Sequence, residues 1–388
     1  MNKFLTASLL GILLITDLFA QSRITGKVIS EKDGAALPFA SVFLSQTTLG
    51  DRTTEQGSFS INKIPNGRYE LIVSYLGYEA LVVPVMLQDT SLTFTLKLKP
   101  KTGQLSEVII RKDPQRESWL RVFRQTFLGA GTAAASCKIL NDEIINIQFD
   151  HSQRLLTAES DGMLEIENPV LGYRIKYLLQ GYVNDYKQNY VLYYGFPQFQ
   201  EMKAKNSRQQ KRWEARRLTA YRGSSLHFMR SLMAKQLEAD GFKVNKVVRQ
   251  VRSNTPEPRE PGDTLPRQLI NPRQTFGPRY ADYLYTGAVS YDSLFHQPAQ
   301  QKGMVLHFRN YLQVIYQREK EPLDYAQSKG RGTGQRYPQT SMVHLFVPTV
   351  GVDENGNVEA PADLVYEGYW AWEKVAEMVP LDYRDNGK

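Results

Sequence analysis

The chain has 388 residues, of which 41% are hydrophobic and 23% charged, and its formal net charge is +8. This length gives room for roughly two or three domains with cores of their own, and this composition excludes intrinsic disorder as the default state. A single cysteine, Cys137, excludes an internal disulfide and any cysteine-rich metal site, and we expect it to be a buried core residue.

Residues 1–20 have the three-part pattern of a secretory signal peptide. Lys3 provides the positive start, Leu9–Ile15 the apolar core, and Ala20 a small residue at the expected cleavage point. The apolar core is too short for a good membrane span, although an uncleaved anchor is the alternative. No later segment approaches the roughly 18 apolar residues of a transmembrane helix. We therefore expect an exported chain with no transmembrane segment after signal removal.

Residues 21–100 are expected to form a β-sandwich, because apolar and polar side chains alternate in several short runs. Within Ser91–Lys99, every second position is leucine or phenylalanine, and the positions between them are serine, threonine or lysine. The turn signals Asp33-Gly34, Gln56-Gly57 and Asn66-Gly67 separate such runs. Short strands at this spacing are typical of a sandwich of about seven strands.

Four motifs follow one another in this region: Gly26-Lys27-Val28, Leu37-Pro38-Phe39-Ala40-Ser41-Val42, Thr53-Thr54-Glu55-Gln56-Gly57-Ser58-Phe59 and Tyr75-Leu76-Gly77-Tyr78-Glu79. Together they resemble the carboxypeptidase-regulatory-like domain, which has a transthyretin-like β-sandwich fold. The resemblance implies an accessory, non-catalytic module of the kind found beside zinc carboxypeptidases, in TonB-dependent receptors and in other envelope proteins. It also implies a location in the periplasm or at the outer membrane of a Gram-negative envelope.

Residues 101–137 are expected to hold a linker and one amphipathic helix. Between residues 115 and 128, the apolar side chains recur at helical spacing, and Gly129 follows as a stop. These apolar residues are Trp119, Leu120, Phe123 and Phe127.

The following segment, residues 138–200, has strand character and is rich in tyrosine. One strand face carries four large apolar residues, and this periodicity predicts that they fill a core. They are Tyr190, Leu192, Tyr194 and Phe196. The alternative is an exposed aromatic surface that stacks on sugar rings, since tyrosine combines a flat apolar face with a polar tip.

Residues 203–222 carry eight basic side chains and one acid, Glu214. If this segment is helical, four of the basic residues lie on neighbouring turns and form a face for an anionic surface such as lipid head groups or acidic glycans. These four are Lys211, Arg212, Arg216 and Arg217. A solvated helix face is the alternative, because charge runs often have no further role. The expected export argues against nucleic acid as a partner.

Ser225 is expected to open another helix, which Gly241 stops, with His227 as a packed residue on it. Residues 253–275 are rich in proline, arginine and asparagine and predict a long loop. The final third is expected to be β-rich. Within it, Asp353–Asn357 predicts a hairpin turn, because it lacks the closing glutamate of a calcium loop.

A short aromatic helix within residues 366–376 is expected to close the fold. This stretch, together with Leu381-Asp382-Tyr383, resembles the tail of exported envelope proteins that carry the same N-terminal domain and have no assigned activity.

The sequence contains no recognisable catalytic motif. A zinc carboxypeptidase needs closely spaced histidine and glutamate ligands, yet none of the five histidines is followed by glutamate three positions later. Gly223–His227 lacks the final glycine of a serine-hydrolase elbow, and Gly330–Gly334 lacks the lysine of a phosphate loop. We therefore predict no catalytic residue, no metal site and no cofactor.

Taken together, these patterns predict a mainly β or α+β protein, in which the sandwich precedes a larger β-rich region with a few helices over residues 138–388. The leading hypothesis is a non-enzymatic cell-envelope binding or scaffold protein whose partner is a glycan, a lipid or an envelope protein. One alternative is a hydrolase with an unrecognised site within residues 138–380. Another is a structural module that docks on an outer-membrane complex.

Overall fold

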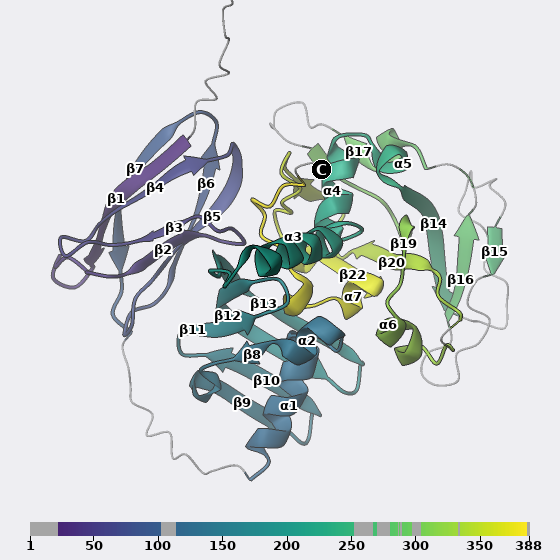
Figure 1. Cartoon of the computed structure of the whole chain (residues 1–388), viewed down its shortest axis with the longest axis horizontal. Coiled ribbons are helices and arrows are strands. Elements are labelled where there is room, and N and C mark those ends of the chain that lie inside the picture. The colour runs from purple at the N-terminus through teal and green to yellow at the C-terminus, as the bar shows by residue number, and fades with distance from the viewer. Residues whose placement is uncertain are drawn as a thin grey trace, which may run out of the picture.

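The computed structural model describes residues 22–101, 114–251, 267–269, 280–285, 287, 289–296, 304–332 and 334–385. The expected signal peptide lies outside these residues. The chain is mainly β, and it forms three regions, each with its own apolar core (Figure 1). No helix in the described part of the chain is long and apolar enough to cross a membrane.

The first region contains the predicted strands, arranged in two small sheets. One sheet consists of β4 (Ser58–Ile64), β1 (Ser22–Ser30) and β7 (Ser91–Leu98), and the other of β3 (Gly50–Arg52), β2 (Ser41–Leu44), β5 (Gly67–Ser74) and β6 (Leu81–Leu87). Alternating residues such as Val28, Leu71 and Leu96 fill the space between them. Gly57 turns the chain at φ +75°, where a Cβ would lie 2.6 Å from the Val28 carbonyl oxygen.

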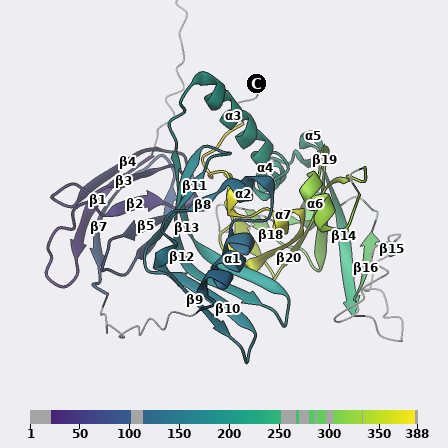
Figure 2. The ribbon, with the colours of Figure 1, turned by 60° about the horizontal axis from the view of Figure 1, so that its bottom comes forward.

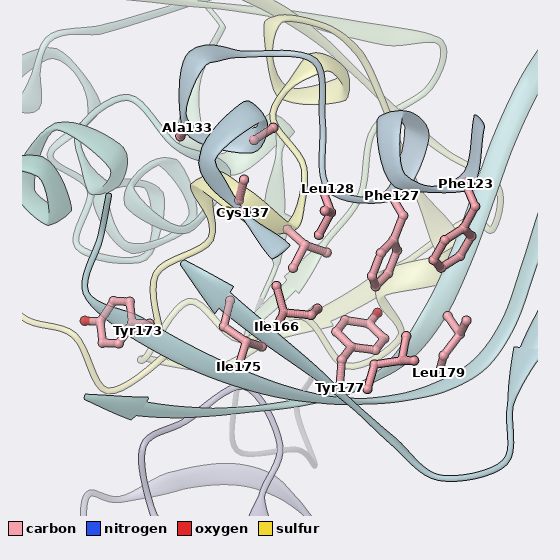
Figure 3. Close-up of a cluster of buried hydrophobic side chains, with 14 of the residues drawn as sticks. Phe123, Phe127, Leu128, Ala133, Cys137, Ile166, Tyr173, Ile175, Tyr177 and Leu179 are labelled. Carbon is pink, nitrogen blue, oxygen red and sulfur yellow. The ribbon is translucent and has the colours of Figure 1, made fainter. Parts of the chain in front are cut away.

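The second region is a six-stranded antiparallel sheet with helices on one face. Its strands are β8 (Lys138–Ile139), β11 (Met163–Asn168), β12 (Tyr173–Asp185), β10 (Leu155–Ser160) and β9 (Ile145–Asp150), with β13 (Tyr190–Glu201) on the other side of β12. The predicted helix is α1 (Arg116–Phe127), and the short α2 (Thr132–Ser136) follows it. Figure 3 shows Phe123 and Phe127 of α1 above Tyr177 of β12, in the core of this region.

The third region contains a second six-stranded sheet and a small three-stranded one. The larger sheet consists of β15 (Arg267–Leu269), β16 (Tyr280–Tyr285), β14 (Phe242–Val251), β19 (Tyr311–Lys320), β20 (Pro338–Leu345) and β22 (Leu364–Gly368), and the smaller of β17 (Phe295–His296), β18 (Met304–Leu306) and β21 (Val350–Val352). Its helices include α6 (Leu323–Ser328) and α7 (Tyr369–Trp372). Of the expected loop 253–275, the described part is β15, which pairs with β16.

Three helices connect the second region to the third: α3 (Ser207–Tyr221), α4 (Ser225–Met233) and α5 (Leu237–Asp240). The single helix expected from Ser225 to Gly241 is thus two helices, and Gly241 ends the second one at φ +92°. Short 3-10 turns cover Asp142–Ile144, Tyr291–Ser293, Pro361–Asp363 and Val375–Glu377.

Two smaller predictions about the third region have clear outcomes. Asp353–Asn357 forms the expected turn, in which the Asp353 carboxylate accepts hydrogen bonds from the backbone N–H groups of Asn355 and Asn357. The aromatic helix near the end is short, because α7 covers only Tyr369–Trp372 of the expected stretch.

An apolar contact fixes the first region against the second. Phe43 of β2 and Ile72 of β5 are fully buried against Leu178 of β12, and Phe196 of β13 packs against the same cluster. These side chains lie on the face of the second sheet that α1 does not cover. The first region therefore covers one end of that face and leaves the other end open.

Candidate ligand-binding face

Strand β13 presents three large apolar side chains to solvent. Tyr193 points towards α1, where its ring centroid lies 5.1 Å from that of Phe127. Because side chains alternate across a strand, Tyr190, Leu192 and Tyr194 point to the opposite face. Their exposed fractions are 44%, 43% and 55%.

The prediction that Tyr190, Leu192, Tyr194 and Phe196 fill a core is therefore wrong. Helix α1 covers the odd-numbered positions of β13, and the even-numbered ones form the uncovered side of the sheet. Phe196 is partly buried, but it packs in the contact with the first region rather than in the core of the second. The open part of the face begins at Tyr194.

Gly181 provides the position on which Tyr194 rests. The register of β12 against β13 shifts between Leu179 and Gly181, which places Gly181 opposite Tyr194. A Cβ at Gly181 would lie 2.6 Å from a ring carbon of Tyr194 and 3.0 Å from its hydroxyl oxygen. The ring therefore lies directly against the backbone of β12, and its remaining surface faces solvent.

The strand register places polar side chains beside this aromatic strand. Leu192 is opposite Val183, Val183 is opposite Thr157, and Thr157 is opposite Gln148, so these residues form one row across four strands. We use the term outer face for the twelve positions on this side that lie beyond the contact of Leu178 and Phe196 with the first region: Asn146, Gln148, Asp150, Leu155, Thr157, Glu159, Gly181, Val183, Asp185, Tyr190, Leu192 and Tyr194. On the other side of that contact, the same side of β12 continues to Lys176 and Arg174. The polar side chains at residues 146, 148, 157 and 159 are exposed.

Two carboxylates on the outer face order the turns at its end. The Asp150 carboxylate accepts hydrogen bonds from the backbone N–H groups of Ser152 and Gln153, which hold its pKa below the usual value. Asp185 accepts from the backbone N–H groups of the two residues that follow Tyr186. These bonds give the open end of the face a defined shape.

The four basic residues predicted to form an anion-binding face do not act together. Lys211, Arg212 and Arg216 are exposed on α3, whereas Arg217 is only 5% exposed. The Arg217 guanidinium donates to the carbonyl oxygens of Leu171 and Gly172. Arg217 is therefore a structural residue, and its assignment to a binding face is wrong.

Position along α3 explains this correction. Arg217 follows the buried Trp213 by four residues, so both side chains lie on the side of the helix that faces the sheet. There the guanidinium lies 4.0 Å from the centroid of the Tyr173 ring and forms a 2.8 Å ion pair with Glu201. A charge run alone does not reveal which of its members are buried.

A cleft of about 720 Å³ lies between α3 and the C-terminal segment. Lys211 and Arg217 line it, whereas Arg212 and Arg216 are not among its lining residues. Two of its carboxylates form ion pairs, Glu201 with Arg217 and Asp385 with Arg222 at 3.0 Å. The other two accept hydrogen bonds, Asp382 from the Thr48 backbone at 2.9 Å and Glu214 from the Gln210 side chain at 3.0 Å. Each of the four carboxylates that line the cleft therefore has a partner within the protein.

The sequence analysis did not identify two partly buried glutamates near α7, Glu373 and Glu377. Burial, reinforced by the nearby charge of Glu377, raises the pKa of Glu373 to about 8. Burial, reinforced by Asp324, raises the pKa of Glu377 to about 7. The signal available in the sequence is their position among the apolar residues of the terminal segment, which we expected to close the fold.

The histidine of α4 and the cysteine are both held among apolar or aromatic side chains. Cys137 is buried, as predicted, and burial raises the pKa of its thiol to about 12. His227 packs between Tyr221 and Phe242, and burial lowers its pKa to about 4. Among the described residues, no group of three or more histidine, cysteine, aspartate or glutamate side chains is arranged to hold a metal ion.

A comparison with protein families identifies the first region. The family model of the CarboxypepD_reg-like domain matches residues 24–110. The chain therefore carries this domain at the position that its sequence motifs predicted. No curated protein matches the sequence.

Solved structures are similar to this chain only distantly. A putative carbohydrate binding protein from Bacteroides uniformis has 9% identity and a TM-score of 0.19, over 40% of this chain and 58% of its own. A putative membrane-associated protein of unknown function from Bacteroides fragilis has 14% identity and a TM-score of 0.18, over 41% and 65%. The pilus 2b backbone protein of group B streptococcus has 22% identity and a TM-score of 0.18, over 21% and 42%. In each case the match spans less than two thirds of the solved chain, and such scores support no inference about function.

Proposed function

We propose that this chain is a non-enzymatic binding protein of the cell envelope whose outer face binds a glycan. One observation carries the proposal: Tyr190 and Tyr194 lie exposed on a sheet face that also presents Gln148, Thr157 and Glu159. Aromatic rings stack on the apolar faces of sugar rings, whereas amide, hydroxyl and carboxylate groups hydrogen-bond sugar hydroxyls. The outer face combines both kinds of group.

The rigid support of the outer face favours binding. Its side chains project from paired strands whose other face is packed against α1. Tyrosine has few rotatable bonds, and Tyr194 already rests on Gly181, so little side-chain freedom is lost when a ligand binds. A site of this kind needs no large conformational change.

The non-enzymatic part of the proposal has separate support. The carboxylates of the cleft are engaged in ion pairs or hydrogen bonds, the Cys137 thiol is held in its protonated form, and His227 is packed among aromatic rings. The envelope location rests on the signal-peptide pattern and on the family of the first region.

The test measures binding of the purified chain, without residues 1–20, to soluble polysaccharides in affinity gels, with mannan and a β-glucan as the neutral probes. The double variant Tyr190→Ala/Tyr194→Ala should weaken binding about tenfold, because each aromatic contact contributes roughly 0.5–1.5 kcal/mol. Tyr337→Ala is the matched control, since Tyr337 is 54% exposed in the third region. Its affinity should equal that of the wild type.

Four outcomes would contradict the proposal. Unchanged affinity in the double variant would remove the outer face as the site, and absence of binding to every probe would remove glycans as the ligand. Release of reducing sugar from a probe would favour the hydrolase alternative. A stable complex with an envelope protein that the double variant loses would instead favour the structural-module alternative.

A further inference from the structure

The outer face differs in charge from the rest of the chain. Its twelve positions include no lysine or arginine and two exposed acids, Asp150 and Glu159, whereas a third acid, Asp185, is buried. The whole chain, in contrast, has a net charge of +8. The outer face is therefore a locally acidic surface on a basic protein, and this contrast bears on which ligands it accepts.

The exposed cations of α3 lie far from this face. Figure 2 shows α3 at the opposite end of the molecule from β9 and β10, which carry the polar half of the outer face. The turns at its end carry two exposed cations, Arg154 and Lys187. The Lys187 ammonium donates to the Ser152 carbonyl oxygen at 3.1 Å and helps to lower the pKa of Asp150. Glu159 lies at the other end of β10 from these turns, opposite Asn146 of β9, so a ligand on that part of the outer face meets its exposed carboxylate.

The dimensions of the face indicate a ligand longer than one sugar. Neighbouring strands are about 4.8 Å apart, so the distance from β13 to β9 across the sheet is roughly 14 Å. Stacking groups lie at the β13 side, on Tyr194, and hydrogen-bonding groups at the other side, on Thr157, Glu159 and Gln148. A ligand that uses both must extend across the strands.

We infer that the outer face binds an uncharged oligosaccharide laid across the strands from Tyr194 towards β9, and that it discriminates against acidic glycans. This inference rests on the proposed glycan-binding function. Exclusion comes from the exposed carboxylates of Asp150 and Glu159, of which Glu159 lies on β10 opposite Asn146. Discrimination of this kind uses repulsion of the wrong ligand rather than an additional contact with the right one.

Gly181 is a positioning residue in this arrangement. With alanine at this position, the Cβ would lie 2.6 Å from a Tyr194 ring carbon and would displace the ring from the sheet. Gly181→Ala should therefore weaken binding of neutral polysaccharide about tenfold, although every ligand-contacting side chain is still present. Gly162→Ala is the matched control, because a Cβ there would meet only Ile144 at 3.9 Å.

The closing experiment compares neutral mannan with acidic polygalacturonate on the purified chain at low and high salt. We expect at least tenfold weaker binding of polygalacturonate at low salt, a smaller difference at high salt, and a smaller difference in Glu159→Lys. Melting temperatures of the variants confirm that they are folded. Equal or tighter binding of polygalacturonate, through the same tyrosines, would overturn this inference and leave the proposed function intact. Loss of the tyrosine dependence for both probes would instead overturn the proposed function itself.

Discussion

At the scale of single residues, the two partly buried glutamates near α7 make stability depend on pH in an unusual direction. Glu373 has a pKa of about 8 in the folded chain, compared with 4.5 for the exposed side chain. The folded state therefore holds this proton over a pH range in which the unfolded state releases it. By linkage, the contribution of Glu373 to stability rises as the pH falls from about 8 towards 4.5.

Substitution of Glu373 should remove this pH dependence. We expect Glu373→Gln to be more stable than the wild type at pH 8.5 and to lose most of the gain that the wild type shows on acidification to pH 6. The difference should be on the order of 2 kcal/mol, a discounted value because the site is partly accessible. Urea unfolding at the two pH values measures it, and Glu354→Gln, an exposed glutamate, is the control. Identical pH profiles in Glu373→Gln and the wild type would contradict the assignment.

Neighbouring residues of one charge run have different roles at this scale. Arg216 and Arg217 are adjacent in sequence, yet Arg216 is exposed and Arg217 is buried against the sheet. The sequence analysis placed both arginines on one binding face, because a run of charges does not indicate which side of a helix packs against the rest of the protein. The difference arises from the contact of α3 with β12 and β13.

At the scale of elements, Arg217 attaches α3 to the second sheet. Its guanidinium satisfies the carbonyl oxygens of Leu171 and Gly172, which precede β12. Arg217→Met keeps the apolar stem but leaves these buried acceptors without their partner, so we expect a loss of about 2–4 kcal/mol in the free energy of unfolding. Arg216→Met, the adjacent exposed residue, should change it by less than about 0.5 kcal/mol. Chemical denaturation of both variants measures the difference, and equal effects would show that the buried bonds contribute little.

Strand β13 shows where element-level prediction reaches its limit. Its residues from Tyr190 to Phe196 are apolar on both faces, so the sequence indicates a strand without indicating which face is buried. Strand β7, in contrast, alternates clearly, and Leu96 and Leu98 are buried as predicted. Which face of a strand is buried can be predicted when apolar and polar positions alternate, and not merely when many residues are apolar.

At the scale of the whole molecule, the C-terminal segment ties the three regions together. Leu381 packs into the core of the first region, and its backbone N–H donates to Gln46 at 2.6 Å. From the third region, Arg230 of α4 donates to the carbonyl oxygens of Leu381 and Tyr383. The last residues of the chain therefore connect the first region to the third, although these regions have separate cores.

This connection should make unfolding cooperative. We expect Leu381→Ala to lower the free energy of unfolding by about 2–5 kcal/mol and to separate the melting of the first region from that of the others. Differential scanning calorimetry should then show two transitions where the wild type shows one. Leu323→Ala is the control, because Leu323 is 45% exposed and should leave a single transition. A single transition in both variants would indicate that the contact of Phe43 with Leu178 suffices for coupling.

Local sequence signals suffice to predict the N-terminal domain and the helix that covers the second sheet, and they contain no recognisable catalytic motif. Each of these depends on local signals: the alternation of apolar and polar residues, turn residues, the helical spacing of apolar residues and short sequence motifs. The tertiary structure alone decided that Arg217 is buried and that Tyr190, Leu192 and Tyr194 are open to solvent. The physical reason is that burial depends on which partner covers a surface. Helix α1 covers one face of β13 and the first region covers part of the other, and neither partner is adjacent to β13 in the sequence.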